Sequence, residues 1–445
     1  MTHSPHQPTN VIGVDPTSLS FGQPDAIDQA QLFIHHQALP CPDPTYPVRD
    51  LSDTPHPATV TGNNAHQVPK WLQEASRLLH SNQAVALPTE TVYGLAANAL
   101  CPEAVEKIYR LKNRPADNPL IIHVASLAML RALLPDRRIP TVYKDLIARY
   151  WPGPLTLLMP RSALIPDVVT CGQATVAVRF PAHPVARAVI AYTGLPLAAP
   201  SANSSGKPSP TLAQHVWDDL RERVPLILDA GQCEWGIEST VVDGLRVSPA
   251  ILRPGGVTLE QIQKVVGFRD CQVYRKNFTD SRLEQTPTTP GMKYRHYSPN
   301  AQVVLLERRT LSDDVHPLTN EQEEADYESS HKEFLQAAQN EMERLALTAT
   351  PQGLTFGLLS VHPDRSLITT PIVPAHCQLH VRSMTDWSKD PTHSDQPCSR
   401  HLFKSFREFD QLGVHYILVE GTSEAHEGLA LMNRLRKAAT RTVYY

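Results

Sequence analysis

Short apolar runs alternate with amphipathic stretches over residues 67–268, which is the pattern of an α/β domain. Each apolar run is short and is followed by Pro, Gly, Ser or Asn, so these runs predict strands. The expected strands lie at 84–87, 120–124, 156–159, 175–180, 197–199, 226–228, 240–242 and 251–252. Because strands and helices do not follow a strict repeat, we expect a mixed sheet rather than a Rossmann double winding.

Helices are expected between these strands. They lie near 69–80, 102–112, 126–134, 184–193 and 211–223. Pro102 stands where the first helical turn favours proline, and Thr211 stands where an N-cap favours threonine.

A second, smaller α/β domain is expected over residues 301–445, with strands at 303–306, 355–359 and 416–419. Apolar side chains at helical spacing predict three helices. Their core-facing residues are Phe334, Ala338, Met342 and Leu345; Leu402, Phe406 and Phe409; and Leu431, Leu435 and Ala438. Residues 361–400 carry scattered Pro, His, Ser and Asp, which indicates a long surface insertion.

Proline-rich stretches mark the parts outside these domains, since 40 prolines occur in 445 residues. Residues 1–66 mix Pro, His, Thr, Asn and Gln with little apolar periodicity, so we expect a mostly disordered extension. Within it, 29–36 is expected to be at most transiently helical. Residues 269–300 end in TPTTPGMKYRHYSPN and are expected to form an extended linker.

The net charge and the cysteines argue against several classes of protein. A formal net charge of -4 gives no global reason to expect nucleic acid or an anionic membrane as a binding surface. The seven cysteines are scattered and form no C-x-x-C pair, which argues against a disulfide framework and a zinc knuckle. No apolar run is long enough to span a bilayer, and the first residues lack a secretory signal. A cytoplasmic protein is the expectation.

Cations cluster at the predicted exit of the second helix, in the sequence KIYRLKNRPADNPLIIHV. Basic residues at a helix C-terminus interact favourably with the helix dipole, which explains many such pairs. That effect does not explain Arg110, Lys112 and Arg114 within five residues, closed off by prolines. Cations so close together favour a shared anion, and a triphosphate is the sharper interpretation. His123, which ends the next strand, is by itself more often structural than catalytic.

The run TVAVRFP predicts a strand with two different faces, since side chains alternate across a strand. Thr175, Ala177 and Arg179 share one face. A buried arginine needs a partner, because an unpaired buried cation is very costly. A structural Asp or Glu is the plain alternative; a substrate carboxylate is the functional one, for which small Ala177 would leave room.

Three further segments place hydroxyls or cations at strand ends. PTETVYG leaves an apolar strand with Thr and Glu side chains, and an N-cap cluster is an equal alternative. LAAPSANSSGKPSPT is a polar loop that could cradle phosphate or be a plain solvated turn; it is not a Walker A loop. Ser239 lies at the edge of the strand near 240, and Arg253 ends the strand near 252. Together these strand ends favour a triphosphate site.

In this order, PTETVYGL, KxRPxxxP, TVAVRxP, APSANxSGxPSPT, ESTVVD and ILRPG resemble the motifs of the YrdC/Sua5 family of threonylcarbamoyl-AMP synthases. The likeness covers 67–268, and MKYRHYSP with the small domain resembles the long, two-domain Sua5 form. Residues 1–66 and 361–400 fall outside it. The resemblance implies a YrdC-like twisted mixed sheet with a concave basic cleft, followed by a Rossmann-like C-terminal α/β domain.

The resemblance also implies roles, residue by residue. Lys112 and Arg114 are the expected catalytic residues. ATP and its phosphates would be held by Lys112, Arg114, Asn118, Thr175, Ser201, Ser209 and Arg253. L-Threonine would be surrounded by Thr91, His123, Arg179, Ala199 and Ser239.

The implied reaction makes a carbamate from the threonine amine and bicarbonate, and the carbamate oxygen then attacks the α-phosphorus of ATP. Mg²⁺ would accompany ATP, with no metal ligand assigned to a protein side chain. The product would pass to a tRNA threonylcarbamoyl transferase, with no membrane partner.

Passive RNA binding is one alternative function, and the charge and the 6% aromatic content speak against it. A related carbamoyltransferase is another, and the missing C-x-x-C pairs speak against it.

The linker adds one hypothesis. Lys293, Tyr294, Arg295, His296 and Tyr297 stand together, whereas a simple tether favours Gly, Ser and Pro. We expect the segment to fold over the nucleotide as a lid, with Tyr297 as an ATP-binding contact. Packing between the domains is the alternative.

Overall fold

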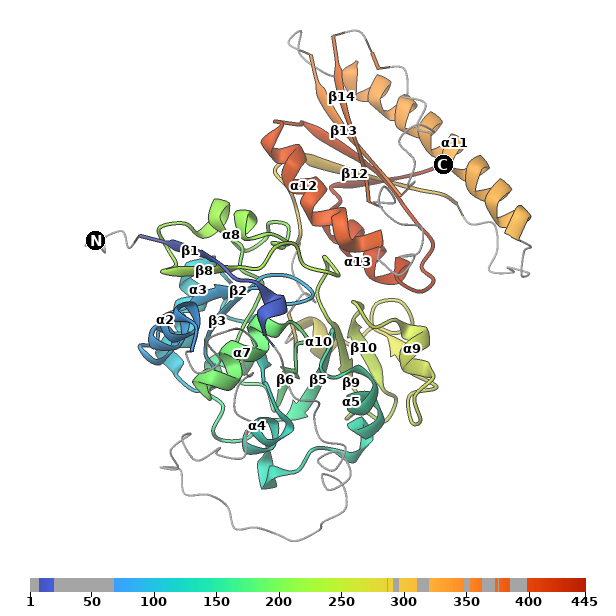
Figure 1. The fold of residues 1–445 in the computed structure, drawn as a ribbon. Helices are drawn as coiled ribbons and strands as arrows, with labels where there is room; N and C mark the ends of the chain where they lie inside the picture. Colours follow the sequence, from blue (N-terminus) through green and yellow to red (C-terminus); the bar gives the residue numbers. More distant parts are fainter. Residues whose placement is uncertain are drawn as a thin grey trace. The chain divides into compact units, whose positions relative to one another are not determined.

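The computed structural model describes residues 8–19, 68–285, 287–290, 296–309, 320–347, 353–361, 373–374, 376–384 and 398–445. It divides the chain into two compact units (Figure 1). Unit 1 is Met1–Ser205 with Ser209–Tyr294, and unit 2 is Gly206–Pro208 with Arg295–Tyr445. Each unit has its own sheet.

Unit 1 contains an eleven-stranded mixed sheet in the order β1-β8-β2-β3-β7-β4-β6-β5-β9-β10-β11. The strands are β1 (Asn10–Gly13), β2 (Val85–Leu87), β3 (Gly94–Asn98), β4 (Ile121–His123), β5 (Leu155–Pro160), β6 (Thr175–Arg179), β7 (Leu197–Ala198), β8 (Leu226–Asp229), β9 (Thr240–Asp243), β10 (Ala250–Arg253) and β11 (Gln272–Val273). All eight predicted strands are present, and parallel and antiparallel pairs both occur. The expectation of a mixed sheet is confirmed.

The helices of unit 1 include the five predicted ones. They are α2 (Lys70–His80), α3 (Pro102–Lys112), α4 (Leu127–Ala132), α5 (Lys144–Tyr150), α6 (Asp167–Thr170), α7 (Pro184–Thr193), α8 (Ala213–Leu220), α9 (Leu259–Gln263) and α10 (Ser281–Gln285), with 3₁₀ turns at Pro16–Ser18, Pro135–Arg137 and Thr141–Tyr143. Pro102 begins α3, as expected. The predicted cap is wrong, because α8 begins after Leu212 and Thr211 lies one residue earlier.

The strand β1 lies in a stretch where the sequence predicted no strand. Asn10–Gly13 pairs in parallel with β8, and Val14 and Leu19 are buried behind it. The strand has only two β-branched residues and no amphipathic run beside it, so it depends on the exposed edge of β8 for its structure. The expected helical segment at 29–36 lies outside the described residues.

The beginning of the predicted linker is part of unit 1. β11 adds a parallel strand beside β10, and α10 follows it. Tyr274 and Leu283 pack in one cluster with Ala177 and with the strand residues Ile121, Leu158, Val241, Ala250 and Leu252. The space expected beside Ala177 for a carboxylate is therefore filled by apolar side chains, and this part of the sequence interpretation is wrong.

Unit 2 contains a five-stranded, all-parallel sheet in the order β14-β13-β15-β12-β16. Its strands are β12 (Gln302–Glu307), β13 (Thr355–Ser360), β14 (Gln378–Ser383), β15 (Tyr416–Glu420) and β16 (Arg441–Tyr444). Its helices are α11 (Asn320–Ala346), α12 (Leu402–Gln411) and α13 (Gly428–Ala438), with a 3₁₀ turn at Cys398–His401. β14 lies inside the stretch predicted as a surface insertion, most of which is outside the described residues.

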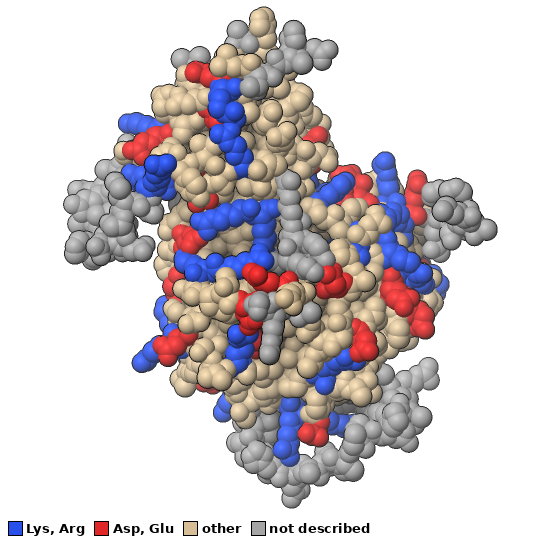
Figure 2. All heavy atoms as spheres, turned by 180° about the vertical axis from the view of Figure 1, so that it is seen from behind, with Lys and Arg blue, Asp and Glu red and all other residues tan. Residues whose placement is uncertain are grey.

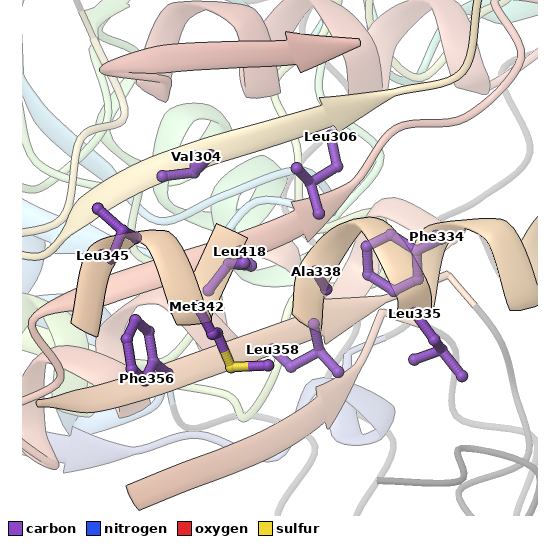
Figure 3. Close-up of a cluster of buried hydrophobic side chains, with 10 residues drawn as sticks. All are labelled: Val304, Leu306, Phe334, Leu335, Ala338, Met342, Leu345, Phe356, Leu358 and Leu418. Atoms are coloured by element: carbon purple, nitrogen blue, oxygen red, sulfur yellow. The ribbon is translucent and has the colours of Figure 1, made fainter. Parts of the chain in front are cut away.

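The helices of unit 2 bury the apolar faces that the sequence predicted. In Figure 1, α11 lies on one face of the sheet, and α12 and α13 lie on the other. Figure 3 shows Phe334, Ala338 and Met342 of α11 against Phe356 and Leu358 of β13. Fully burying such side chains contributes about 1.5–3 kcal/mol each. This parallel sheet with helices on both faces confirms the expected Rossmann-like domain.

Candidate active site

Three polar side chains form a row across neighbouring strands of unit 1. In the register of the sheet, His123 on β4 is opposite Arg179 on β6, and Arg179 is opposite Thr156 on β5. Thr156 Oγ1 lies 2.8 Å from Ser239 Oγ, just before β9. Strand ends far apart in the sequence are thereby brought together at one edge, as expected for an α/β ligand site.

The guanidinium group of Arg179 has several partners within unit 1. It donates to Glu90 Oε1 at 2.6 Å, to Thr91 Oγ1 at 2.8 Å and to the carbonyl of Gly153 at 3.2 Å. Both Arg179 and Glu90 are almost fully buried. From the sequence, a structural Asp or Glu is the alternative to a substrate carboxylate, and Glu90 is such a partner. Its carboxylate fixes the guanidinium group from one side.

Thr91 is positioned by its own turn. Thr89 Oγ1 lies 2.8 Å from Thr91 Oγ1 and donates to the carbonyl of Val92 at 2.6 Å. The Thr91 hydroxyl therefore lies between another hydroxyl and the Arg179 guanidinium. Such a group can exchange hydrogen bonds with a polar ligand beside Arg179.

His123 is buried and is held as a neutral imidazole. Burial lowers its pKa to about 3, and the positive charge of Arg179 acts in the same direction. Its Nδ1 atom has no hydrogen-bond partner within the described part of the chain. A buried polar atom of this kind is costly unless a ligand or water completes it.

Lys112 ends α3 and is buried. Its ammonium group donates to the carbonyls of Ser201 and Asn203, the second at 2.6 Å. Asn203 Oδ1 lies 3.2 Å from the same nitrogen and also accepts from Ser201 Oγ at 2.6 Å. The lysine thus ties the Ser-rich loop to the end of α3.

Arg114 is also buried and is held by the loop that follows α3. Its Nε donates to the carbonyl of Asn118 at 3.0 Å and a terminal nitrogen donates to the carbonyl of Pro119 at 2.9 Å. The hydroxyl of Tyr109 donates to the same Asn118 carbonyl at 3.0 Å. These carbonyl contacts set the direction of the guanidinium group.

Arg253 and Ser239 form the other end of the row. Arg253 donates to the carbonyl of Ser239 at 2.9 Å and to its hydroxyl at 3.2 Å. Gly255 makes this approach possible, because a Cβ at this position would lie 2.3 Å from the carbonyl oxygen of Glu238. A glycine is required where two backbones touch in this way.

Three further predicted site residues of unit 1 have other contacts or positions than the row. Ala199 is buried and its N–H donates to the carbonyl of Ile121 at 3.0 Å. Ser209 is buried and its hydroxyl donates to Glu238 Oε1. Thr175 begins β6, so it lies about 13 Å along the strand from Arg179 and outside the row.

Tyr297 belongs to unit 2, where it is buried. Its ring stacks on Phe403 with 5.2 Å between centroids, and the guanidinium group of Arg434 lies 5.5 Å from the ring centroid. The expected lid residues 293–295 lie outside the described part of the chain. The contact of Tyr297 with ATP stays a prediction.

Sequence reasoning missed several residues that complete the geometry. Glu90 was visible beside Thr91 in the TET sequence, but nothing local showed that it pairs with Arg179. Thr156, Asn203 and Glu238 gave no signal of these pairings, because their contacts join segments distant in the sequence.

The charge seen in Figure 2 is mixed, with basic and acidic side chains interspersed over the visible face.

The described residues contain no group of three or more His, Cys, Asp or Glu side chains placed to hold a metal ion. Among the same residues, no helix combines the length and the apolar character needed to cross a bilayer.

Family models place the two units in one class of protein, a YrdC-like domain followed by a Sua5-type C-terminal domain. Residues 77–255 match the Sua5/YciO/YrdC model, described as telomere recombination. Residues 257–440 match the model of the C-terminal domain of threonylcarbamoyl-AMP synthase.

Individual relatives agree over most of the chain. Threonylcarbamoyl-AMP synthase of Schizosaccharomyces pombe is 42% identical, over 83% of this chain and 88% of its own. The synthase of Pyrococcus abyssi is 38% identical, over 86% and 98%. The crystal structure of P. abyssi Sua5 complexed with L-threonine covers 85% of this chain and 98% of its own, with 37% identity and a TM-score of 0.65. The chain therefore belongs to the Sua5 family of threonylcarbamoyl-AMP synthases.

Proposed function

We infer that this chain is a nucleotidyltransferase that forms threonylcarbamoyl-AMP and pyrophosphate from L-threonine, bicarbonate and ATP. The observation that carries this proposal is the row formed by His123, Arg179 and Thr156, which continues to Ser239 and Arg253. In this proposal, the row would supply donors for a carboxylate and donors for phosphate at one edge of the sheet. The relationship to the synthases supports the same reaction.

L-Threonine would be held near Arg179, Thr91 and His123. The Arg179 guanidinium, already oriented by Glu90, is the expected partner of the amino-acid carboxylate. The neutral imidazole of His123 and the Thr91 hydroxyl are suited to a hydroxyl group or an amine. Ala199 and Ser239 would complete the surroundings. A P. abyssi relative of this family has been crystallised with L-threonine, which supports the choice of amino acid.

ATP would be held by Lys112, Arg114 and Arg253, with Asn118, Ser201 and Ser209 as further polar contacts. The three cations are oriented by carbonyl oxygens, so their positions are set before the nucleotide binds. Thr175 and Tyr297 remain proposed ATP contacts; Thr175 lies outside the row, and Tyr297 belongs to unit 2.

Mg²⁺ would come with ATP. Magnesium usually keeps several waters and binds substrate phosphates with one or two carboxylates. When bound, it would neutralise charge on the leaving pyrophosphate.

In the proposed reaction, the threonine amine attacks bicarbonate carbon and water leaves, giving a carbamate. A carbamate oxygen then attacks the α-phosphorus, and the bond to the bridging oxygen of pyrophosphate breaks. No general base is assigned; positioning and electrostatics by Lys112, Arg114, Arg179 and Arg253 carry the catalysis. The mixed anhydride would then serve the threonylcarbamoyl-adenosine modification of tRNA through a separate transferase.

The test is pyrophosphate release from ATP with L-threonine and bicarbonate omitted in turn. We expect release to require both, together with a product of the mass of threonylcarbamoyl-AMP. Release that continues without either compound would contradict the proposed reaction.

A further inference from the structure

A short segment after α10, residues 287–290, contains a buried hydroxyl group that the proposed reaction does not yet use. The side chain of Thr289 is 0% exposed, and its Oγ1 has no hydrogen-bond partner within the described part of the chain. Buried hydroxyl groups are nearly always hydrogen-bonded, because leaving one unsatisfied costs free energy. Thr289 therefore requires an explanation beyond packing.

The position of the segment suggests one. Pro290, the next residue, presents its carbonyl oxygen 3.5 Å from a terminal nitrogen of Arg253. The same guanidinium group donates to the carbonyl and the hydroxyl of Ser239. All of these residues belong to unit 1. Thr289 thus immediately precedes a residue whose backbone approaches a cation at the end of the polar row.

The other end of the row shows the same feature. His123 Nδ1 is also buried without a partner among the described residues. A substrate that spans the row would complete polar atoms at both ends. Thr170 also has a buried, unpartnered hydroxyl, but it lies on α6 just before the start of β6, at the opposite end of that strand from Arg179.

We propose that Thr289 is a further substrate-binding residue, whose hydroxyl donates a hydrogen bond to the anionic oxygen bound by Arg253. This rests on the proposed function, in which Arg253 binds a phosphate oxygen of ATP. A hydroxyl donor beside a guanidinium group adds a directed hydrogen bond to a charged oxygen. It also explains why a polar threonine is retained at a fully buried position.

The experiment uses the full chain with Thr289→Val, which replaces the hydroxyl by a methyl group of similar size. ATP affinity is measured by titration calorimetry, and the Tm of the free protein is measured in parallel. We expect ATP to bind about 10- to 100-fold more weakly. The Tm should stay the same or rise, because an unsatisfied buried hydroxyl has been removed.

Two further variants complete the test. Thr289→Ser keeps the hydroxyl and should bind ATP within about threefold of the wild type, since only a methyl group is lost. Thr170→Val makes the matched change away from the row and should leave ATP affinity unchanged. Wild-type affinity in Thr289→Val, or a weaker affinity accompanied by a lower Tm, would overturn the proposal, because the second result indicates a structural hydroxyl. Wild-type protein that binds ATP but releases pyrophosphate without threonine would instead contradict the proposed reaction.

Discussion

The two sheets both end in buried polar side chains, but these side chains are satisfied in different ways. In unit 1, carbonyl oxygens hold Lys112, Arg114 and Arg253. In unit 2, the carboxylate of Glu420 accepts hydrogen bonds from the Ser360 hydroxyl at 2.6 Å and the Val361 N–H at 2.9 Å. A carbonyl oxygen orients a cation without carrying a full opposing charge. A carboxylate that already accepts hydrogen bonds from several donors needs no further partner.

This difference separates a site that suits a substrate from a cluster that stabilises a fold. Oriented cations are prepared for an anionic ligand. The buried carboxylate of unit 2, with His331 Nδ1 3.3 Å from its other oxygen, ties α11 to two strands. Chemistry is therefore expected in unit 1, and the polar cluster of unit 2 is expected to be structural.

The largest effect expected concerns substrate choice in unit 1. L-Valine lacks the hydroxyl that Thr91 and His123 would bind, so we expect kcat/KM to fall by about 10⁴ relative to L-threonine. L-Serine lacks only a methyl group and should lose about 1–3 kcal/mol. Pyrophosphate release with each amino acid measures both values. Equal use of valine would show that the row does not recognise a hydroxyl group.

Lys112→Met removes one of the oriented cations. We expect turnover to fall by about 10²–10³, because a phosphate donor is lost. Stability should also fall by about 1–3 kcal/mol, because the carbonyls of Ser201 and Asn203 lose their donor. Turnover at saturating ATP and thermal unfolding are the measurements.

The matched control is Lys107→Met. Lys107 lies on the same helix and donates to the carbonyl of Asn82 at 2.9 Å, away from the row. Its loss should leave turnover unchanged. If both variants lose turnover equally, Lys112 acts through the helix rather than through the substrate.

His123 should make unit 1 sensitive to acid. Its pKa in the folded protein is about 3, below the value of roughly 6.5 of an unfolded chain. As pH falls through this window, the unfolded state binds a proton that the folded state does not, so stability is lost. The loss should reach roughly 3 kcal/mol at pH 4.

Denaturant unfolding between pH 7 and pH 4 measures this effect. His123→Gln should show a shallower loss of stability, while His80→Gln, at an exposed position of α2, should follow the wild type. The same slope in His123→Gln and the wild type would exclude His123 as the source.

Glu420→Gln tests the other side of the comparison and should have the smallest effect. We expect stability to fall by about 1–3 kcal/mol, because charged hydrogen bonds to Ser360 and Val361 are weakened. Turnover at a temperature well below Tm should stay within about twofold of the wild type. A tenfold loss of turnover would mean that the cluster of unit 2 takes part in the reaction.

The sequence predicted most of the fold where local patterns are strong. Alternation and turn residues located all eight predicted strands of unit 1, and helical spacing located the core-facing side of α11, α12 and α13. It missed β3, because Gly94–Asn98 contains small residues and no β-branched one. It also missed β14, which lies among polar residues.

The sequence predicted the residues of the candidate site more reliably than it predicted which residues they contact. The cations were found because they cluster in the sequence, but the partners of Lys112 lie 89 and 91 positions away. Likewise, the pairing of Arg179 with Glu90 joins distant segments. The apolar packing around Ala177 of β6 also involves Tyr274 and Leu283. Both residues lie in a stretch that the sequence predicts to be a linker. Such contacts are properties of the folded chain and leave no local signal.

The pairing of β1 with β8 has a consequence for synthesis. Thr9 donates to the carbonyl of Val224, 215 positions later in the chain. At typical translation rates the first strand must wait on the order of 10–40 s for its partner to be made. During that time it has no sheet to join, and the new edge of β8 stays open until it arrives. The N-terminal strand is therefore expected to join the sheet only after β8 has been synthesised.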